Sequence, residues 1–268
     1  MRSPRVPADV QARHPFLGKP PFILAHRGGA AEAPENTRRA FEHAADLGLT
    51  HVETDAHVSE DGVVVLSHDD AVDRTLNARG KIAHFPWREL VELKDPDGRA
   101  PMRLDEALTD FPTLRFNVDA KCDAVAEPLA HLARAHPGRI LLASFSDRRL
   151  ARMRAIAPRE ASSTGQAATA ALVMLSRLEP SRALRLATRV PALRDAVAAQ
   201  VPARFRGIPV VTARFVDLAH ALNMQVHVWT VDEIDEMRTL LARGVDALVT
   251  DEPSRALAVL DEWGGAGC

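Results

Sequence analysis

The sequence predicts an α/β protein of the (β/α)8 TIM-barrel class, with a small insertion after the third strand. Short apolar runs alternate with helical segments along the 268-residue chain, and this alternation is typical of βαβ units that share a parallel sheet. About eight apolar runs fit the eight strands of one barrel. Polar, ionisable residues follow directly after several of these runs, as they do at the active-site face of such barrels.

Composition narrows the class of protein. The hydrophobic fraction of 46% and the charged fraction of 26% are typical of a globular chain. A formal net charge of −2 disfavours a dedicated nucleic-acid binder. Two cysteines cannot form a disulfide scaffold in a chain of this length. The N-terminus lacks the apolar core of a secretory signal, and no apolar run is long enough to span a bilayer. We therefore expect a reduced, cytoplasmic protein.

Residues 1–21 contain five prolines and are predicted to form an N-terminal surface arm ahead of a barrel domain at 22–268. The candidate strands are residues 22–25, 51–54, 63–66, 114–118, 140–143, 199–201, 226–229 and 247–249. A ninth, weak candidate lies at 159–162. The sequence alone does not decide which of the nine candidates form the eight strands of the barrel.

Helical segments separate the strands. The first, at 37–47, has Asn36 as a candidate N-cap and Gly48 as a C-terminal stop. The other main helices are predicted at 124–135, 147–156, 215–222 and 233–242. Two connections are longer than a simple crossover. Residues 70–113 are predicted to form the insertion, with short helices at 86–93 and 104–110, and residues 164–198 are mostly helical and basic.

The strand ends concentrate ionisable groups. They carry His26 with Arg27, Glu53 with Asp55, His68, Asp119 with Lys121, and Asp251. Glu53 and Asp55 are two residues apart on a strand, so both carboxylates face the same side. With Asp119 they form an all-oxygen set suited to one Mg²⁺ or Ca²⁺ ion. Without a cation the three anions would repel one another, and one would stay protonated.

Two histidines and two basic residues complete the candidate site. His26 and His68 can exchange protons near neutral pH, and Arg27 and Lys121 can neutralise phosphate oxygens. A single histidine after an apolar run is more often a packed core residue. The joint occurrence of these groups on several strand ends favours metal-assisted phosphoester cleavage.

The ordered motifs resemble the glycerophosphodiester phosphodiesterase family. They are Ala25-His26-Arg27-Gly28, Pro34-Glu35-Asn36-Thr37, Glu53-Thr54-Asp55, Ser67-His68-Asp69-Asp70, Asp73-Arg74-Thr75, Leu104-Asp105-Glu106-Ala107-Leu108, Ser144-Phe145, Val228-Trp229-Thr230-Val231 and Thr250-Asp251-Glu252-Pro253. The resemblance covers about residues 22–260. It implies a TIM barrel that hydrolyses glycerophosphodiesters to glycerol 3-phosphate and an alcohol with a divalent metal.

The resemblance also implies roles for individual residues. His26 and His68 would be the acid/base pair, while Glu53, Asp55 and Asp119 would bind the metal. Arg27 and Lys121 would hold the phosphate, and Trp229 would line the glycerol or alcohol pocket. Glu35 and Asn36 would support the site, or would only begin the following helix. The family usually carries Glu-x-Lys where this chain has Asp119-Ala120-Lys121. The shorter Asp119 implies coordination through water or a shifted metal preference.

Two alternatives remain at this stage. The first is lysophospholipase D-type cleavage at a membrane surface, with peripheral contact through residues 171–206. This segment has seven arginines against Glu179 and Asp195, but a solvated basic helix face is the simpler interpretation. The second is a non-catalytic module that binds a phosphodiester, which the intact histidines and carboxylates disfavour. The alcohol, the metal and the oligomeric state are left open.

Overall fold

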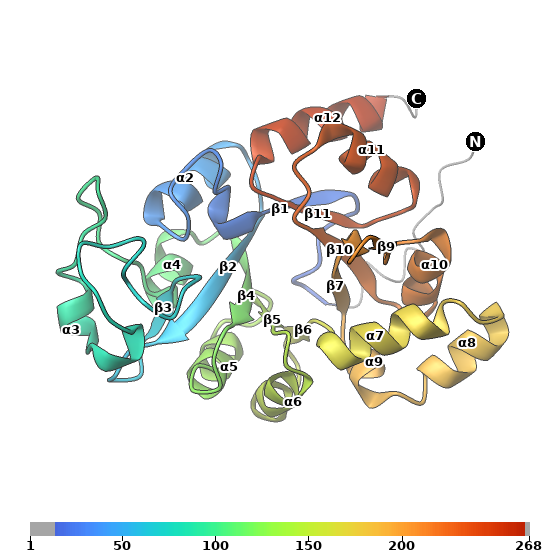
Figure 1. The fold of residues 1–268 in the computed structure, drawn as a ribbon, viewed down its shortest axis with the longest axis horizontal. Coiled ribbons are helices and arrows are strands. Elements are labelled where there is room, and N and C mark those ends of the chain that lie inside the picture. Colours follow the sequence, from blue (N-terminus) through green and yellow to red (C-terminus); the bar gives the residue numbers. More distant parts are fainter. Residues whose placement is uncertain (1–13, 266–268) are drawn as a thin grey trace.

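Eight parallel strands form a nearly closed barrel in the computed structural model, which describes residues 14–265 (Figure 1). In barrel order they run β6-β5-β4-β2-β1-β11-β10-β7, and a parallel bridge between Ser163 and Ala198 links the two ends of that row. The strands are β1 (Phe22–Ala25), β2 (His51–Val58), β4 (Arg115–Ala120), β5 (Ile140–Ala143), β6 (Ala161–Ser162), β7 (Ala198–Pro202), β10 (Gln225–Trp229) and β11 (Ala247–Thr250). The predicted fold class is confirmed.

The structure assigns the nine strand candidates to their places. The third candidate forms β3 (Val64–Leu66), which pairs antiparallel with β2 and lies outside the barrel. The weak ninth candidate forms β6, which is a barrel strand. The physical reason is the length of the connection. Only a tight turn containing Gly62 (φ +86°) separates β2 from β3, whereas a parallel crossover needs a dozen residues or more.

Helices follow the strands around the barrel. They are α2 (Arg38–Asp46), α5 (Ala126–Ala135), α6 (Asp147–Ile156), α7 (Gln166–Leu175), α8 (Pro180–Ala187), α9 (Pro191–Asp195), α10 (Ala213–Ala221), α11 (Ile234–Ala242) and α12 (Pro253–Gly265). One predicted cap is wrong. Thr37, not Asn36, caps α2, because the Thr37 hydroxyl accepts from the Ala40 N–H. Gly48 does end this helix, with φ +75°.

The predicted insertion lies to one side of the barrel (Figure 1). It contains η2 (Ile82–His84), α3 (Trp87–Leu90) and α4 (Leu104–Asp110). Val65, Val72, Ile82 and Leu90 form a small apolar cluster separate from the main core. The insertion therefore has packing of its own beside the barrel.

Residues 14–18 pack across the N-terminal ends of the strands. Phe16 is fully buried and Leu17 nearly so, in a cluster that includes Leu141 and Val197. This part of the predicted surface arm therefore contributes to the core, because it carries two large apolar side chains. The rest of the predicted arm, residues 1–13, lies outside the described residues.

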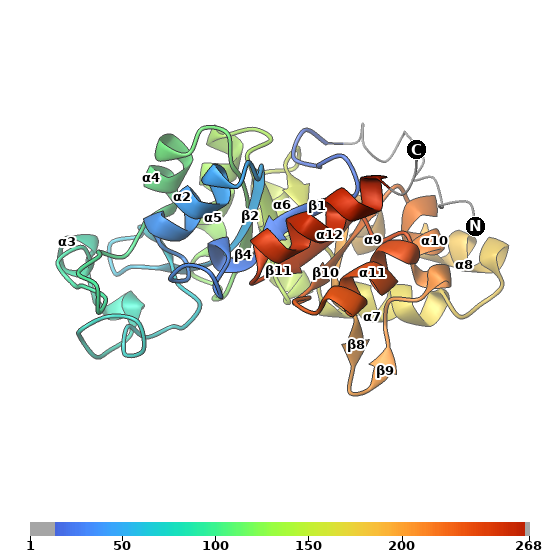
Figure 2. The same cartoon turned by 90° about the horizontal axis from the view of Figure 1, so that it is seen from above.

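A short hairpin projects from the barrel after β7. It consists of β8 (Arg204–Phe205) and β9 (Ile208–Pro209), which pair antiparallel, and Figure 2 shows it standing away from the body of the molecule. None of the helices within residues 14–265 has the length and apolar character needed to cross a bilayer.

Candidate active site

The candidate site lies at the carboxyl ends of the barrel strands. Asp55 of β2 is the register neighbour of Asp119 of β4, and Glu53 is the neighbour of Asn117. Side chains two residues apart on a strand share a side, so Glu53 and Asp55 face the barrel interior together. All four residues are more than nine-tenths buried. The parallel register thus gathers the predicted carboxylates from two neighbouring strands.

His26 follows β1 and pairs with an acid from the last strand of the barrel. Its Nδ1 lies 2.7 Å from Oδ1 of Asp251, and its Nε2 lies 3.8 Å from Oε2 of Glu53. Burial lowers the pKa of His26, but the hydrogen bond to Asp251 and the charges of Glu53 and Asp251 outweigh it, so the pKa is raised. Because the carboxylate accepts from Nδ1, Nε2 is the nitrogen left to exchange a proton.

Lys121 bridges two of the predicted metal ligands. Its ammonium lies 2.7 Å from Asp55 Oδ1 and 2.7 Å from Asp119 Oδ2. Arg27 Nε approaches Asp55 Oδ2 at 3.3 Å from the other side. Burial raises the pKa of Asp55, but the charge and hydrogen bond of Lys121 outweigh burial and lower it. Asp55 is therefore ionised and held between two cations.

Glu53 experiences the opposite balance. Burial and the charge of Asp55 raise its pKa to about 8, as expected for carboxylates crowded without enough cationic charge. Oδ1 of Asp119 and Oδ1 of Asn117 are buried and have no hydrogen-bond partner. Buried oxygen atoms without partners, beside a carboxyl with a raised pKa, fit a hard divalent cation.

The three carboxylates are not gathered into a ready-made cluster. Across residues 14–265, no group of three or more His, Cys, Asp or Glu side chains has the arrangement of a metal site. Asp55 and Asp119 are joined through Lys121, while Glu53 accepts instead from the backbone N–H of Arg27 at 3.1 Å. The ligand assignment therefore remains a prediction, supported by the oxygen donors rather than by completed coordination geometry.

A strained turn places Arg27 and Asn36 at the site. Arg27 (φ 52°) and Asn36 (φ 57°) both adopt left-handed backbone conformations, which are uncommon for residues other than glycine. The Asn36 N–H donates to the Arg27 carbonyl, and Asn36 Nδ2 donates to Asp55 Oδ2 at 3.1 Å. Thr54 Oγ1 completes the set by donating to Asn36 Oδ1 at 2.6 Å. Asn36 therefore orients a candidate metal ligand, which explains why it does not cap the helix.

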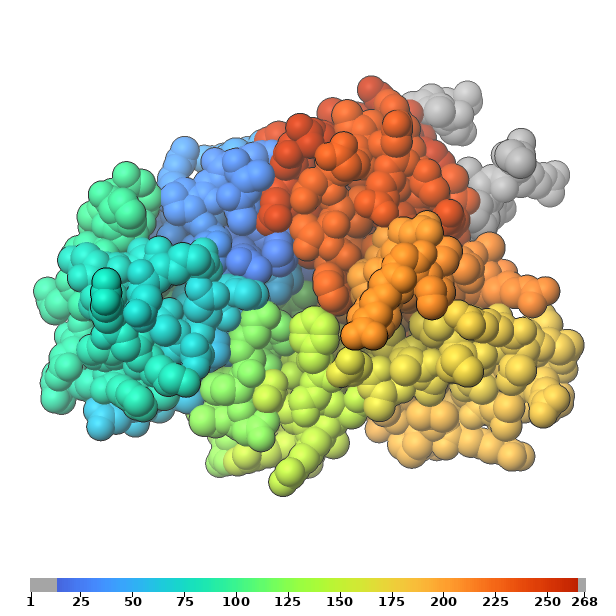
Figure 3. All heavy atoms as spheres, in the orientation of Figure 1, coloured from blue at the N-terminus to red at the C-terminus, as the bar shows by residue number. Residues whose placement is uncertain are grey.

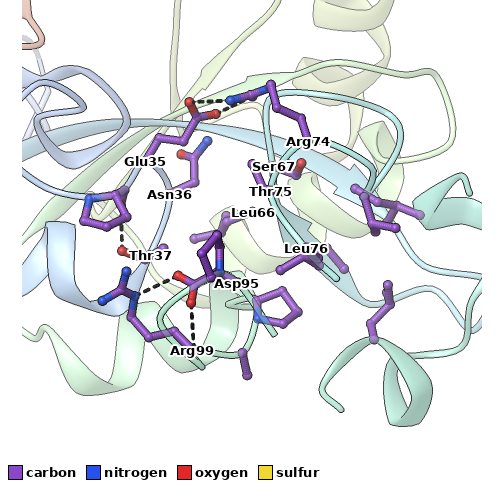
Figure 4. Close-up of a pocket in the computed structure, with 18 of the residues that line it drawn as sticks. Glu35, Asn36, Thr37, Leu66, Ser67, Arg74, Thr75, Leu76, Asp95 and Arg99 are labelled. Carbon is purple, nitrogen blue, oxygen red and sulfur yellow. Dashed lines mark hydrogen bonds and ion pairs between the residues drawn. The ribbon is translucent and has the colours of Figure 1, made fainter. Parts of the chain in front are cut away.

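His68 is tied to the site through a chain of ion pairs. Its side chain is 39% exposed, and its Nδ1 lies 2.8 Å from Asp69 Oδ1. Arg74 Nε donates to Asp69 Oδ2 at 2.6 Å. The two terminal nitrogens of Arg74 donate to the two carboxylate oxygens of Glu35, at 2.9 and 2.7 Å. Glu35 also accepts from Arg27 at 3.2 Å. Through these contacts the insertion links His68 to the turn that carries Arg27, and Figure 4 shows the Arg74–Glu35 part of the link.

A pocket of about 380 Å³ lies between this turn and the insertion. Glu35, Asn36 and Arg74 line its polar side, and Leu66 and Leu76 line its apolar side (Figure 4). Of the predicted site residues it includes only Glu35 and Asn36. The pocket therefore lies beside the candidate active site rather than within it.

Two aromatic residues stand at the rim. Trp229 is half-buried at the end of β10, and the Phe145 ring meets it edge-on, with the ring centres 5.6 Å apart. Phe145 is 56% exposed. The two rings form an apolar wall at the carboxyl ends of β5 and β10, and the role of Trp229 in holding substrate stays a prediction.

The structure adds roles that the sequence did not assign. Asp251, which only marked a strand end, is the partner of His26. Asp232, which lies shortly before α11, accepts from Thr250 Oγ1 and from the Asp251 N–H, both at 2.8 Å. Asn117 lies two residues before Asp119 and shares its side of β4. The position of Asp251 at the end of a strand marked it as a candidate site residue. That position did not identify His26 as its partner.

The chain is similar in sequence to known phosphodiesterases. The model of the glycerophosphoryl diester phosphodiesterase family matches residues 26–255. A probable glycerophosphodiester phosphodiesterase of Mycobacterium tuberculosis is 37% identical over 253 residues, covering 91% of this chain and 94% of the relative. A human lysophospholipase D is 33% identical, but over only 40% of this chain and 37% of the relative.

Solved structures show the same fold. An Oleispira antarctica phosphodiesterase, solved with the product sn-glycerol-3-phosphate, superposes with a TM-score of 0.72 at 22% identity, covering 90% of this chain and 97% of that one. A Galdieria sulphuraria structure gives 0.73 at 21% identity, with 90% and 98% covered. From the match to the family model and to the mycobacterial relative, the chain belongs to the glycerophosphodiester phosphodiesterase family of phosphoric diester hydrolases.

Proposed function

We propose that this chain hydrolyses glycerophosphodiesters, such as glycerophosphocholine or glycerophosphoethanolamine, to glycerol 3-phosphate and an alcohol. The observation that carries the proposal is the juxtaposition of His26 with Asp251 and Glu53, at the same end of the barrel as the Asp55–Lys121–Asp119 group. Family membership favours an enzyme over a non-catalytic binding module. The Oleispira structure with sn-glycerol-3-phosphate supports this product for a protein of the same fold.

The two histidines are the proposed acid/base pair. Each has an aspartate on Nδ1, Asp251 for His26 and Asp69 for His68. A carboxylate that accepts from Nδ1 holds the ring in one orientation and leaves Nε2 to give or take a proton. One histidine removes the proton from the attacking hydroxyl, and the other protonates the departing alcohol oxygen.

The charged residues would bind the phosphate and one divalent ion. Arg27 and Lys121 carry the positive charge that phosphate oxygens require, and Trp229 offers an apolar surface to glycerol or the alcohol. Glu53, Asp55 and Asp119 would hold Mg²⁺ or Ca²⁺, in keeping with the typical dependence of the family on a divalent metal. Such an ion would neutralise charge developing on the phosphate.

Release of glycerol 3-phosphate from glycerophosphocholine tests the proposal. We expect turnover with Mg²⁺ or Ca²⁺, loss of turnover on chelation by EDTA, and recovery when the ion is restored. His26→Ala and His68→Ala should each abolish turnover, whereas His131→Ala, on the exposed face of α5, should not. Full activity in either of the first two variants would refute the assigned chemistry.

Lysophospholipase D-type cleavage is a second candidate. The partial match to a human enzyme of that name and the exposed Phe145 at the rim both favour it. Choline release from lysophosphatidylcholine, compared with release from glycerophosphocholine at equal concentration, separates the two activities. A preference for the soluble diester would reject this candidate.

A further inference from the structure

The β8–β9 hairpin is a built, protruding structure rather than a loose loop. Arg206 (φ 48°) and Gly207 (φ 80°) form its two-residue turn, and two positive φ values are typical of the turn that matches strand twist. Arg204 donates to the Gly207 carbonyl at 2.7 Å and so braces the turn. At the base, the Val210 N–H donates to the Ala203 carbonyl at 3.0 Å. The turn is therefore held at both ends.

The hairpin presents two large apolar side chains to solvent on one face. Phe205 and Ile208 are direct cross-strand partners, and side chains of such a pair lie on the same side of a hairpin. They are 57% and 56% exposed, and Figure 3 shows the orange hairpin uncovered on the face in view. Exposed apolar side chains grouped in this way mark an interaction surface.

Positive charge surrounds this apolar pair. The guanidinium of Arg206 lies 5.5 Å from the centre of the Phe205 ring. Residues 203–214 contain Arg204, Arg206 and Arg214 and no acidic residue. Apolar side chains flanked by arginines are complementary to a bilayer with anionic lipids, because the rings enter the interface while the cations meet the headgroups.

The basic helices before the hairpin expose only one large apolar side chain, Met174 of α7. Leu172 of α7, Ala183 of α8 and Leu193 of α9 are buried against the barrel, while the arginines at 177, 182 and 185 are exposed. These helices therefore fit the simpler interpretation of a solvated basic face. Two large exposed apolar side chains stand together among exposed arginines only in the hairpin, at the end of the 171–206 segment.

We propose that the β8–β9 hairpin docks the protein onto an anionic lipid bilayer. The hairpin follows β7 at the end of the barrel that carries the candidate active site, so docking would turn that site toward the membrane. The docking itself is independent of the reaction. Only its consequence, easier access to membrane-derived diesters, rests on the proposed function.

Co-sedimentation with vesicles tests the docking. The wild-type chain should bind equimolar phosphatidylglycerol/phosphatidylcholine vesicles and bind pure phosphatidylcholine vesicles more weakly. The variant F205S/I208S should lose about tenfold in vesicle partitioning, and Arg206→Gln should lose less. Met174→Ser is the matched control, because Met174 is 64% exposed on α7, and it should bind like wild type.

Two further measurements distinguish loss of docking from misfolding and from self-association. Turnover of soluble glycerophosphocholine should be the same in all these proteins, which reports that each is folded and tests the proposed function independently. Sedimentation velocity reports self-association. The docking proposal is overturned if wild type does not bind the anionic vesicles, if F205S/I208S binds as wild type does, or if Met174→Ser loses as much. It is also overturned if the wild-type chain is a dimer that F205S/I208S dissociates.

Discussion

The two ends of the barrel both contain histidines, but burial and hydrogen-bond partners shift the histidine pKa values in opposite directions at the two ends. At the carboxyl ends of the strands, His26 pairs with Asp251 and its pKa is raised. At the opposite end, burial lowers the pKa of His51 to about 4 and that of His227 to about 3. His51 donates to the Phe16 carbonyl at 2.7 Å, and His227 lies between the amides of Gln200 and Gln225.

The carboxyl ends of the strands are called the upper end here, and the opposite ends the lower end. The difference shows that residues for stability and residues for chemistry lie at opposite ends of one barrel. At the lower end, which Phe16 closes, His51 and His227 have neutral partners and remain uncharged at neutral pH. The upper end holds carboxylates, a lysine and buried oxygen atoms without partners, among them Asp119 Oδ1. Such an arrangement is costly unless a ligand completes it.

The largest expected effect compares one histidine from each end. His26→Gln should lower kcat by about 10²–10⁴-fold, the usual contribution of a general acid or base. His227→Gln should leave kcat near wild type, because His227 contacts Gln200, Gln225 and Phe22 and none of the candidate catalytic residues. Initial rates of glycerol 3-phosphate release measure both. Equal losses would mean that the two ends are not functionally distinct.

Packing at the lower end gives the second prediction. Phe16→Ala should lower the free energy of unfolding by about 3–5 kcal/mol, because it empties a fully buried aromatic site. Urea titration measures the change. Phe205→Ala, at a 57% exposed ring, is the control and should change stability by about 0.5 kcal/mol or less. A similar loss of stability in both variants would contradict the view that Phe16 is part of the core that closes the lower end.

Acid should destabilise the protein through the lower histidines. Their pKa values in the folded state, about 4 and about 3, lie below the unfolded value of 6.5. The unfolded chain therefore binds more protons as the pH falls below 6.5, and stability decreases. Between pH 7 and pH 4.5 each histidine should cost about 2–3 kcal/mol. The double variant H51Q/H227Q should show a smaller difference between those two pH values in urea titrations. An unchanged difference would be evidence against this account.

The smallest expected effect concerns the aspartate partners. Asp251→Asn should lower kcat about 10- to 100-fold, because a hydrogen bond to a charged group contributes about 1.5–3 kcal/mol. Asp246 is the lower-end counterpart, since it pairs with His220 at 2.8 Å. Asp246→Asn should reduce the melting temperature and leave kcat near wild type. If Asp246→Asn lowered kcat as much as Asp251→Asn, the proposed difference between a catalytic upper end and a structural lower end would be wrong.

Much of the fold was predictable because buried parallel strands read as apolar runs. The first and fifth strand candidates match β1 and β5 residue for residue. β3 and β6 were harder to assign. A three-residue strand and a two-residue strand carry little periodic signal, and their places depend on connection length and barrel closure.

The candidate site was partly predictable for a similar reason. A polar residue at the end of an apolar strand signals a position at the barrel mouth, as Asp55 and Asp119 illustrate. For Asn36 the sequence left two roles open, support of the site and a helix cap, because its position before a helix also suits a cap. Its left-handed backbone turns the side chain toward Asp55 instead.

The sequence by itself determined the barrel class, the strand ends that carry charge, and the residue types available for phosphodiester chemistry. These depend on local alternation of apolar and polar residues, which the chain displays directly. Only the tertiary structure decided which side chains contact one another. His26 meets Asp251 across 225 positions, Lys121 lies between carboxylates of two strands, and Phe16 closes the far end. Such pairs form when the barrel closes, because register and burial bring together groups that no local pattern connects.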